Sequence, residues 1–183
     1  LRTATWVFGG ESGGPLAWGR EQALVLTERL CGGRPRTSAT PDGPFSIAVG
    51  APATHAVIRR FAESGQVSLD GLGEDDYRIS EVTVGAKTVV LIAGRNDRAA
   101  MYGLFGFFEA LGCRFLLSGD VMPDVNPDLT VPVLDLTGRT GCSWRGIWLQ
   151  FCFVGNSIMS LCDYERLFCQ LAKMRMNRVV YYL

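Results

Sequence analysis

The run Trp144-Arg145-Gly146-Ile147-Trp148-Leu149-Gln150 is short and apolar, which predicts a β-strand. Residues 163–177 have helical periodicity, and Arg178-Val179-Val180-Tyr181-Tyr182-Leu183 predicts a second strand. A strand, a crossover helix and a parallel second strand form the repeating unit of a β/α barrel. Because both faces of a parallel sheet normally need cover, we expect this unit to be the opening of a barrel that is truncated after two strands.

The helix of this unit carries its own boundary signals. Asp163 is the expected N-cap, and Asn177 is expected to take the left-handed conformation that ends the helix. The expected buried face consists of Tyr164, Leu167, Phe168, Leu171 and Ala172.

The preceding residues predict a sheet with helices packed on it. Strands are expected at residues 3–8, 45–49, 77–82, 88–93 and 113–117, and helices at residues 15–31, after Thr54, and after Asn96 or Asp97. The strongest helix shows an apolar face of Met101, Leu104, Phe105, Phe108 and Leu111 before Gly112 ends it. The fold class predicted for this part is α+β.

Residues 118–141 are rich in Pro, Asp, Asn, Gly and Thr, which favour turns and extended chain. We expect a linker there, with one edge strand at residues 129–134. The predicted organisation is an accessory α+β domain over residues 1–136, followed by the linker and the strand-helix-strand unit over residues 137–183.

Charge and hydropathy exclude several functions. Eighteen Lys and Arg residues balance eighteen Asp and Glu residues across the 183-residue chain, without a basic run, so no nucleic-acid partner is expected. Every apolar stretch is interrupted well before the roughly 18 residues that a membrane-spanning helix needs, so no membrane partner is expected either.

The six cysteines do not form a C-x-x-C pair, and His55 is the only histidine, so no metal site or cofactor is predicted. We expect the cysteines to be reduced core thiols, which slightly favours a cytoplasmic location while leaving export open. His55 is expected to be a surface or capping residue. Carboxylates at Asp75, Asp76 and residues 120–128 lie in turn-rich stretches, where solvated or capping roles are expected.

Several motifs together resemble a known family. They are the segments 77–79, 89–94, 97–103 and 108–115, followed by Trp144-Arg145-Gly146-Ile147 and by residues 171–179. This series is similar to the accessory domain and barrel entry of β-hexosaminidases and α-glucuronidases, which are glycoside hydrolases. The resemblance implies an N-terminal sheet with helices packed on it, as in the hexosaminidase accessory domain, and then the first β-α-β unit of a catalytic barrel.

The resemblance also implies a substrate contact. The arginine of the family's Arg-Gly strand binds sugar hydroxyls, which maps onto Arg145, and we expect Trp148 and Gln150 to contribute to the same sugar site. Gln150 stands where hexosaminidases have an aspartate, so the resemblance does not predict which sugar is bound. The family's catalytic carboxylates lie on later barrel strands, so no catalytic residue is assigned within this sequence.

The function predicted from the sequence is that of a non-catalytic N-terminal portion of a glycoside hydrolase, which braces the barrel and whose partner is a carbohydrate substrate. An alternative is a carbohydrate-binding or interaction module in which Trp144 and Trp148 stack on sugars. A third reading is a phosphate-binding protein that uses the glycine-rich loop of residues 9–14. Because an opened barrel exposes strand edges and an apolar face, we also expect a homo-oligomer formed through residues 144–183.

Overall fold

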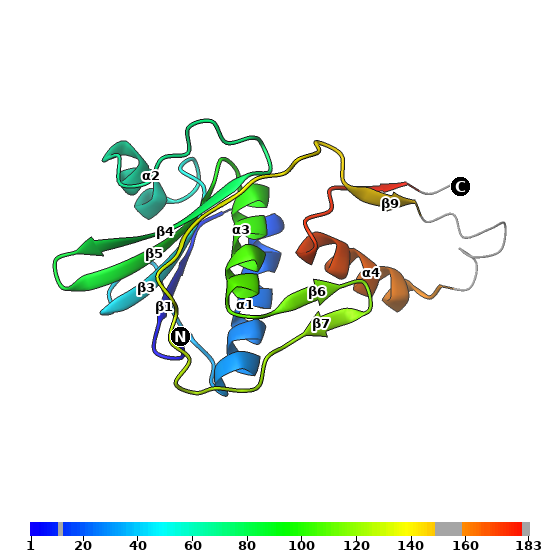
Figure 1. The fold of residues 1–183 in the computed structure, drawn as a ribbon, viewed down its shortest axis with the longest axis horizontal. Helices are drawn as coiled ribbons and strands as arrows, with labels where there is room; N and C mark the ends of the chain where they lie inside the picture. Colours follow the sequence, from blue (N-terminus) through cyan, green and yellow to red (C-terminus); the bar gives the residue numbers. More distant parts are fainter. Residues whose placement is uncertain (11–12, 149–158, 181–183) are drawn as a thin grey trace.

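The computed structural model describes residues 1–10, 13–148 and 159–180, and it confirms an α+β architecture. Its main sheet has six strands in the order β2-β1-β3-β5-β4-β8 (Figure 1). Their bounds are β1 Thr5–Phe8, β2 Arg36–Ser38, β3 Phe45–Gly50, β4 Tyr77–Val84, β5 Lys87–Gly94 and β8 Asp135–Gly138.

The main sheet is mixed. Strands β2, β1, β3 and β5 are mutually parallel, whereas β4 pairs antiparallel with β5 and β8 pairs antiparallel with β4. The strands expected at residues 77–82 and 88–93 form a hairpin, β4–β5, with Gly85 in the left-handed region (φ +62°) that its tight turn requires.

Helices cover both faces of this sheet. The helices α1 (Pro15–Cys31) and α3 (Asp97–Ala110) pack on one face, and α2 (Ala56–Glu63) packs on the other. Helix α1 occupies the expected residues 15–31, because Pro15 suits its first turn and Gly32 takes the left-handed conformation that ends it. The cap of α3 is Asn96, while α2 is capped by His55 instead of the predicted Thr54.

Helix α3 is buried on all sides, which goes beyond the single apolar face predicted for it. Every residue from Ala99 to Phe108 is buried. Its second cover is α4 (Leu161–Lys173), which packs on the side of α3 away from the sheet (Figure 1). A helix that is apolar all round needs such cover on more than one side.

Three glycines make room for the ring of Tyr77. A side chain at Gly103, Gly106 or Gly138 would meet atoms of Tyr77, so α3 and β8 approach this ring more closely than any other residue would allow. Glycine costs helix stability, and here the close approach of α3 to the sheet requires it. Tyr77 is thereby fixed between the helix and the edge strand.

The segment predicted as a linker contains regular structure. β6 (Arg114–Leu116) forms a hairpin with β7 (Gly119–Val121), and the edge strand is β8 instead of the predicted residues 129–134. An ion pair between Arg78 and Asp135 joins β8 to β4, and the turn-rich composition gives no hint of this cross-strand pair. The predicted boundary between the two parts of the chain, after residue 136, falls inside β8. The division into residues 1–136 and 137–183 stays a prediction.

The C-terminal unit, which we define as β9 (Gly146–Trp148), α4 and β10 (Arg178–Val180), has the predicted strand-helix-strand order with parallel strands. The helix begins earlier than predicted, because Ser160 is its N-cap and Asp163 completes a capping box. The left-handed residue after the helix is Arg175 (φ +61°), not Asn177. Of the predicted buried face only Leu171 is buried, since α4 is covered only along its side toward α3 and β6.

Candidate functional site

Asp75 is the centre of the contact between the main sheet and the C-terminal unit. It lies just before β4, and only 5% of its surface is exposed. One carboxylate oxygen accepts a hydrogen bond from Arg98 Nε of α3 at 2.7 Å. The other accepts from Arg145 Nη2 and from Asn177 Nδ2, both at 2.8 Å. One carboxylate therefore joins three segments of the chain.

The electrostatics of Asp75 follow from these contacts. Burial alone raises the pKa of its carboxyl, but the hydrogen bonds from Arg145, Arg98 and Asn177 outweigh burial and leave the pKa below its usual range. The carboxylate is therefore ionised near neutral pH, as a partner of two guanidinium groups must be.

Arg145 is held by protein acceptors on all three of its guanidinium nitrogens. Besides the bond to Asp75, its Nε donates to the backbone oxygen of Arg175 at 2.8 Å and its Nη1 donates to the backbone oxygen of Cys142 at 2.7 Å. The guanidinium also lies 5.8 Å from the ring centre of Tyr102. These contacts fix the chain just before β9.

A second contact joins Arg175 to the region around Tyr77. Arg175 Nη1 donates to Glu109 Oε2 at 2.7 Å and to the Tyr77 hydroxyl at 3.1 Å. Burial raises the pKa of Tyr77, so its hydroxyl stays protonated and acts here as an acceptor. Because Arg175 has a left-handed backbone, its carbonyl faces Arg145 while its side chain reaches α3.

A third contact joins α4 to the β6–β7 hairpin. Lys173 Nζ donates to Asp120 Oδ2 at 2.8 Å, and Gln170 Nε2 donates to Asp120 Oδ1 at 3.1 Å. Lys173 and Asp120 are both nearly buried, and Lys173 also lies 5.8 Å from the ring centre of Phe115. Because the cost of desolvating both charges offsets much of their attraction, a buried ion pair of this kind adds little net stability.

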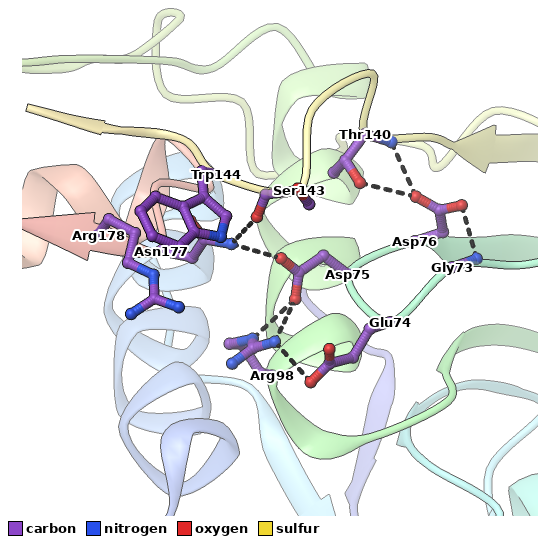
Figure 2. A pocket seen from close by; sticks show the side chains of 10 residues that line it. All are labelled: Gly73, Glu74, Asp75, Asp76, Arg98, Thr140, Ser143, Trp144, Asn177 and Arg178. Carbon is purple, nitrogen blue, oxygen red and sulfur yellow. Dashed lines mark hydrogen bonds and ion pairs between the residues drawn. The ribbon is translucent and has the colours of Figure 1, made fainter.

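A pocket of about 530 Å³ opens beside Asp75 (Figure 2). Its walls come from the loop before β4, from α3, from the segment between β8 and β9, and from the start of β10. The lining residues are Gly73, Glu74, Asp75, Asp76, Arg98, Thr140, Ser143, Trp144, Asn177 and Arg178. The wall is polar, with one exposed indole.

The predicted sugar-binding residues have different positions. Trp148 is the last residue of β9 and is 57% exposed, whereas Arg145 precedes β9 and Gln150 lies outside the described residues. A parallel barrel builds its active site at the carboxyl ends of its strands, which is the end where Trp148 lies. The sugar contacts of all three residues stay predictions.

Asp75 and Asn177 were not recognised as site residues from the sequence. Asp75 resembled an ordinary turn carboxylate, and Asn177 a helix terminator. The signal that could have found them is their position, because each polar residue lies just before a strand-like run, Asp75 before β4 and Asn177 before β10. Asp76 does match the expectation, because it accepts hydrogen bonds from the backbone of Gly73 and Thr140.

The remaining candidates take structural positions. His55 is buried, its Nδ1 accepts from Val57 N, and burial lowers its pKa. The glycine-rich loop includes residues 11 and 12, which lie outside the described residues, so its phosphate-binding role stays untested. Within residues 1–10, 13–148 and 159–180, no group of His, Cys, Asp or Glu is arranged to hold a metal ion, and no helix is long and apolar enough to cross a membrane.

The cysteines only partly follow the prediction of core thiols. Cys31 and Cys113 are buried, and burial raises the pKa of Cys113 to about 11, which makes it unreactive. Cys142 and Cys162 are exposed, because one lies in the segment before β9 and the other in the first turn of α4. The described cysteines form no disulfide, and Cys152 lies outside the described residues.

Comparisons with known proteins confirm the resemblance to glycoside hydrolases. The fold consists of an α+β domain, formed by the main sheet and its helices, and an attached β-α-β unit of the kind that is repeated in β/α barrels. Residues 21–107 match the family model described as Glycosyl hydrolase family 67 N-terminus. No curated protein matches the chain significantly.

Solved structures of glycoside hydrolases share the fold. A family GH115 4-O-methyl-α-glucuronidase with specificity for decorated arabinogalactans has a TM-score of 0.67 and 14% identity, over 99% of this chain and 25% of its own. The GH20 β-N-acetylhexosaminidase of Streptomyces coelicolor A3(2) has a TM-score of 0.58 and 13% identity, over 98% of this chain and 30% of its own. A GH84 protein has a TM-score of 0.64 and 16% identity, over 100% of this chain and 27% of its own. The chain thus spans about a quarter to a third of these proteins.

Proposed function

We propose that this chain acts as the non-catalytic N-terminal portion of a glycoside hydrolase and that its main sheet braces the opening of a catalytic barrel. The family match and the shared fold support the enzyme class. The bracing role rests on one observation, namely the buried Asp75 carboxylate and its bonds to Arg145 and Asn177. Arg145 and Asn177 directly precede the two parallel strands, so Asp75 fixes where both strands begin.

The polar contacts at Glu109 and Asp120 support the same role. They hold α4 and the turn after it against α3 and the β6–β7 hairpin. Hydrogen bonds that need several partners at once require a defined geometry, unlike a purely apolar contact. The main sheet therefore sets the orientation of the β-α-β unit as well as its attachment.

In this proposal, the catalytic acid and base and the rest of the sugar site come from other parts of the enzyme. Trp148 would contribute to that sugar site, as supported by its exposure at the carboxyl end of β9, and Gln150 would follow it. The contacts of Arg145 support a positioning role, because each of its guanidinium nitrogens already donates to a protein acceptor.

Hydrogen exchange tests the bracing role. In the purified chain, the amides of residues 167–173 in α4 should exchange far more slowly than those of an isolated helix of that length, which is marginally stable in water. Exchange at the rate of a free peptide would refute the bracing. In a separate assay, the chain should not hydrolyse any of a panel of aryl glycosides, and turnover of one of them would show that it carries its own catalytic groups.

A further inference from the structure

The order in which the chain adds strands to the parallel part of the main sheet reverses between β1 and β3. The chain leaves β1 through α1 toward β2, whereas it leaves β3 through α2 toward β4 and β5 on the other side. Because α1 and α2 pack on opposite faces of the sheet, these connections separate at the carboxyl ends of β1 and β3. Open sheets of parallel strands bind their ligands outside the strand ends at such a point.

In this chain, the side chain of His55 fills the place between the two strand ends. Only 5% of His55 is exposed. A methyl group at Gly9, which follows β1, would lie 2.5 Å from His55 Cβ. One at Gly50, the last residue of β3, would lie 2.7 Å from the same atom. A side chain at either position would therefore overlap His55, so the close packing of this residue requires both glycines.

The hydrogen bonds of His55 require a neutral ring. A backbone carbonyl can only accept, so the contact between His55 Nε2 and the Val7 oxygen at 3.3 Å places a proton on Nε2. Val57 N donates to His55 Nδ1, also at 3.3 Å, so Nδ1 carries a lone pair and caps α2. A protonated Nδ1 would be a second donor facing the Val57 N–H group. Protonation therefore removes the cap of α2 and places two donors against each other.

The charged groups around this ring come from α2 and α3. Burial lowers the pKa of His55, and the contact with the Val7 oxygen and the charge of Asp97 in α3 offset only part of that effect. Asp97 also accepts a hydrogen bond from Thr54 Oγ1 at 2.6 Å, which ties the loop after β3 to α3. The Arg59 side chain of α2 donates to two backbone oxygens of the same loop. The described residues that follow β1 and end β3 against the ring are glycines and carry no charge.

We propose that His55 is a pH-sensitive plug between the carboxyl ends of β1 and β3. Uptake of a proton at Nδ1 releases the imidazole from between Gly9 and Gly50, uncaps α2 and opens the two strand ends to solvent. At neutral pH the plug is in place, and acid removes it. This inference is independent of the bracing role, because α2 packs on the face of the sheet opposite α3, against which the C-terminal unit lies.

An NMR titration of the purified chain tests the plug directly, because His55 is the only histidine and its ring signals are unique. Long-range proton–nitrogen spectra show which ring nitrogen carries the proton. We expect the ring to be protonated at Nε2 alone near neutral pH and to titrate with a midpoint below about 6.5. Over the same range, the protection factors of the Gly9 and Val57 amides against hydrogen exchange should fall about fivefold or more, as loss of a helix cap allows. Those of the β5 amides should not change.

Two variants separate the plug from general effects of acid. His55→Asn provides a capping side chain that does not titrate, so the protection factor of the Val57 amide should become independent of pH. Asp97→Asn can still accept the hydrogen bond from Thr54 but lacks the charge that favours the imidazolium, so the midpoint of the His55 titration should shift to lower pH. Asp42→Asn is the matched control, because Asp42 forms an exposed ion pair with an arginine of β2 and should leave this midpoint unchanged.

Several results would overturn the proposal. Two concern the ring itself, namely a neutral form protonated at Nδ1 and a titration midpoint that is the same in Asp97→Asn and Asp42→Asn. Two concern the opening, namely protonation of His55 without loss of protection at Gly9 and Val57, and an equal loss of protection in β5, which would indicate unfolding of the whole sheet. The last is an unchanged pH dependence of amide protection in His55→Asn.

Discussion

Replacing Asp75 with Asn tests the central contact with almost no change in shape. The substitution removes the negative charge and leaves two guanidinium groups, of Arg98 and Arg145, facing a neutral amide. Removing one partner of a buried ion pair costs about 3–5 kcal/mol. The Arg98 side chain is 38% exposed, so water screens part of its share, and we expect a total cost of about 2–4 kcal/mol.

This cost should be concentrated in the C-terminal unit. Urea unfolding followed by circular dichroism would measure the free energy of unfolding, and hydrogen exchange would locate the loss. Amides in α4 and β10 should lose protection, while those in β3 and β5 should lose little. Asp42→Asn is the matched control, because Asp42 forms an exposed ion pair with Arg36 at 2.9 Å and should cost about 0–1 kcal/mol.

The reasoning fails if Asp75→Asn changes the free energy of unfolding no more than Asp42→Asn does. It also fails if protection is lost evenly over the main sheet and the C-terminal unit, because the contact would then not be local to their junction. The depressed pKa of Asp75 adds a pH dependence. Its stabilising effect is present above the unfolded-state pKa of about 3.9 and is lost as pH falls through the lower folded-state value.

Three further predictions concern other parts of the molecule. Burial lowers the pKa of His55 in the folded chain, so the unfolded chain takes up a proton at higher pH. The free energy of unfolding should therefore fall as pH drops below about 6.5. In the His55→Asn variant, the midpoint of urea unfolding should depend less on pH over that range. Gly106→Ala should destabilise by about 1–3 kcal/mol in urea unfolding, since the new methyl group would overlap the Tyr77 hydroxyl, and an unchanged midpoint would contradict the tight packing. The chain should self-associate through residues 144–183, where Trp148, Phe168 and Val180 are exposed, and static light scattering that shows only monomer would contradict this prediction.

Local signals predicted much of the fold. A proline at the first turn and a glycine after the last turn fix both ends of α1, because each acts through its own backbone conformation. The β4–β5 hairpin is predictable for the same reason, since apolar runs on both sides of a glycine turn are close in the sequence. The predictions were wrong where burial depends on segments that are distant in the sequence. In α4, for example, most residues of the predicted buried face are not buried.

The site could not be predicted in the same way. The partners of Asp75 are 23, 70 and 102 residues away in the sequence, and no local pattern connects them. A carboxylate in a turn has a favourable local role in any case, so its type and position carry no sign of a distant partner. Arg145 was singled out through the family resemblance, and only the fold shows that its guanidinium faces Asp75.

The three donors to Asp75 also have a consequence for synthesis on the ribosome. Arg98 is made soon after Asp75, but Arg145 and Asn177 follow 70 and 102 residues later. At about 5–20 residues per second, the strands from β1 to β5 and helix α3 emerge seconds before β9, and β8 emerges only shortly before it. The nascent N-terminal part can thus fold first and present a half-satisfied carboxylate as a template. In the proposed bracing, β9 and β10 would each be positioned once the residue before it, Arg145 or Asn177, reaches Asp75.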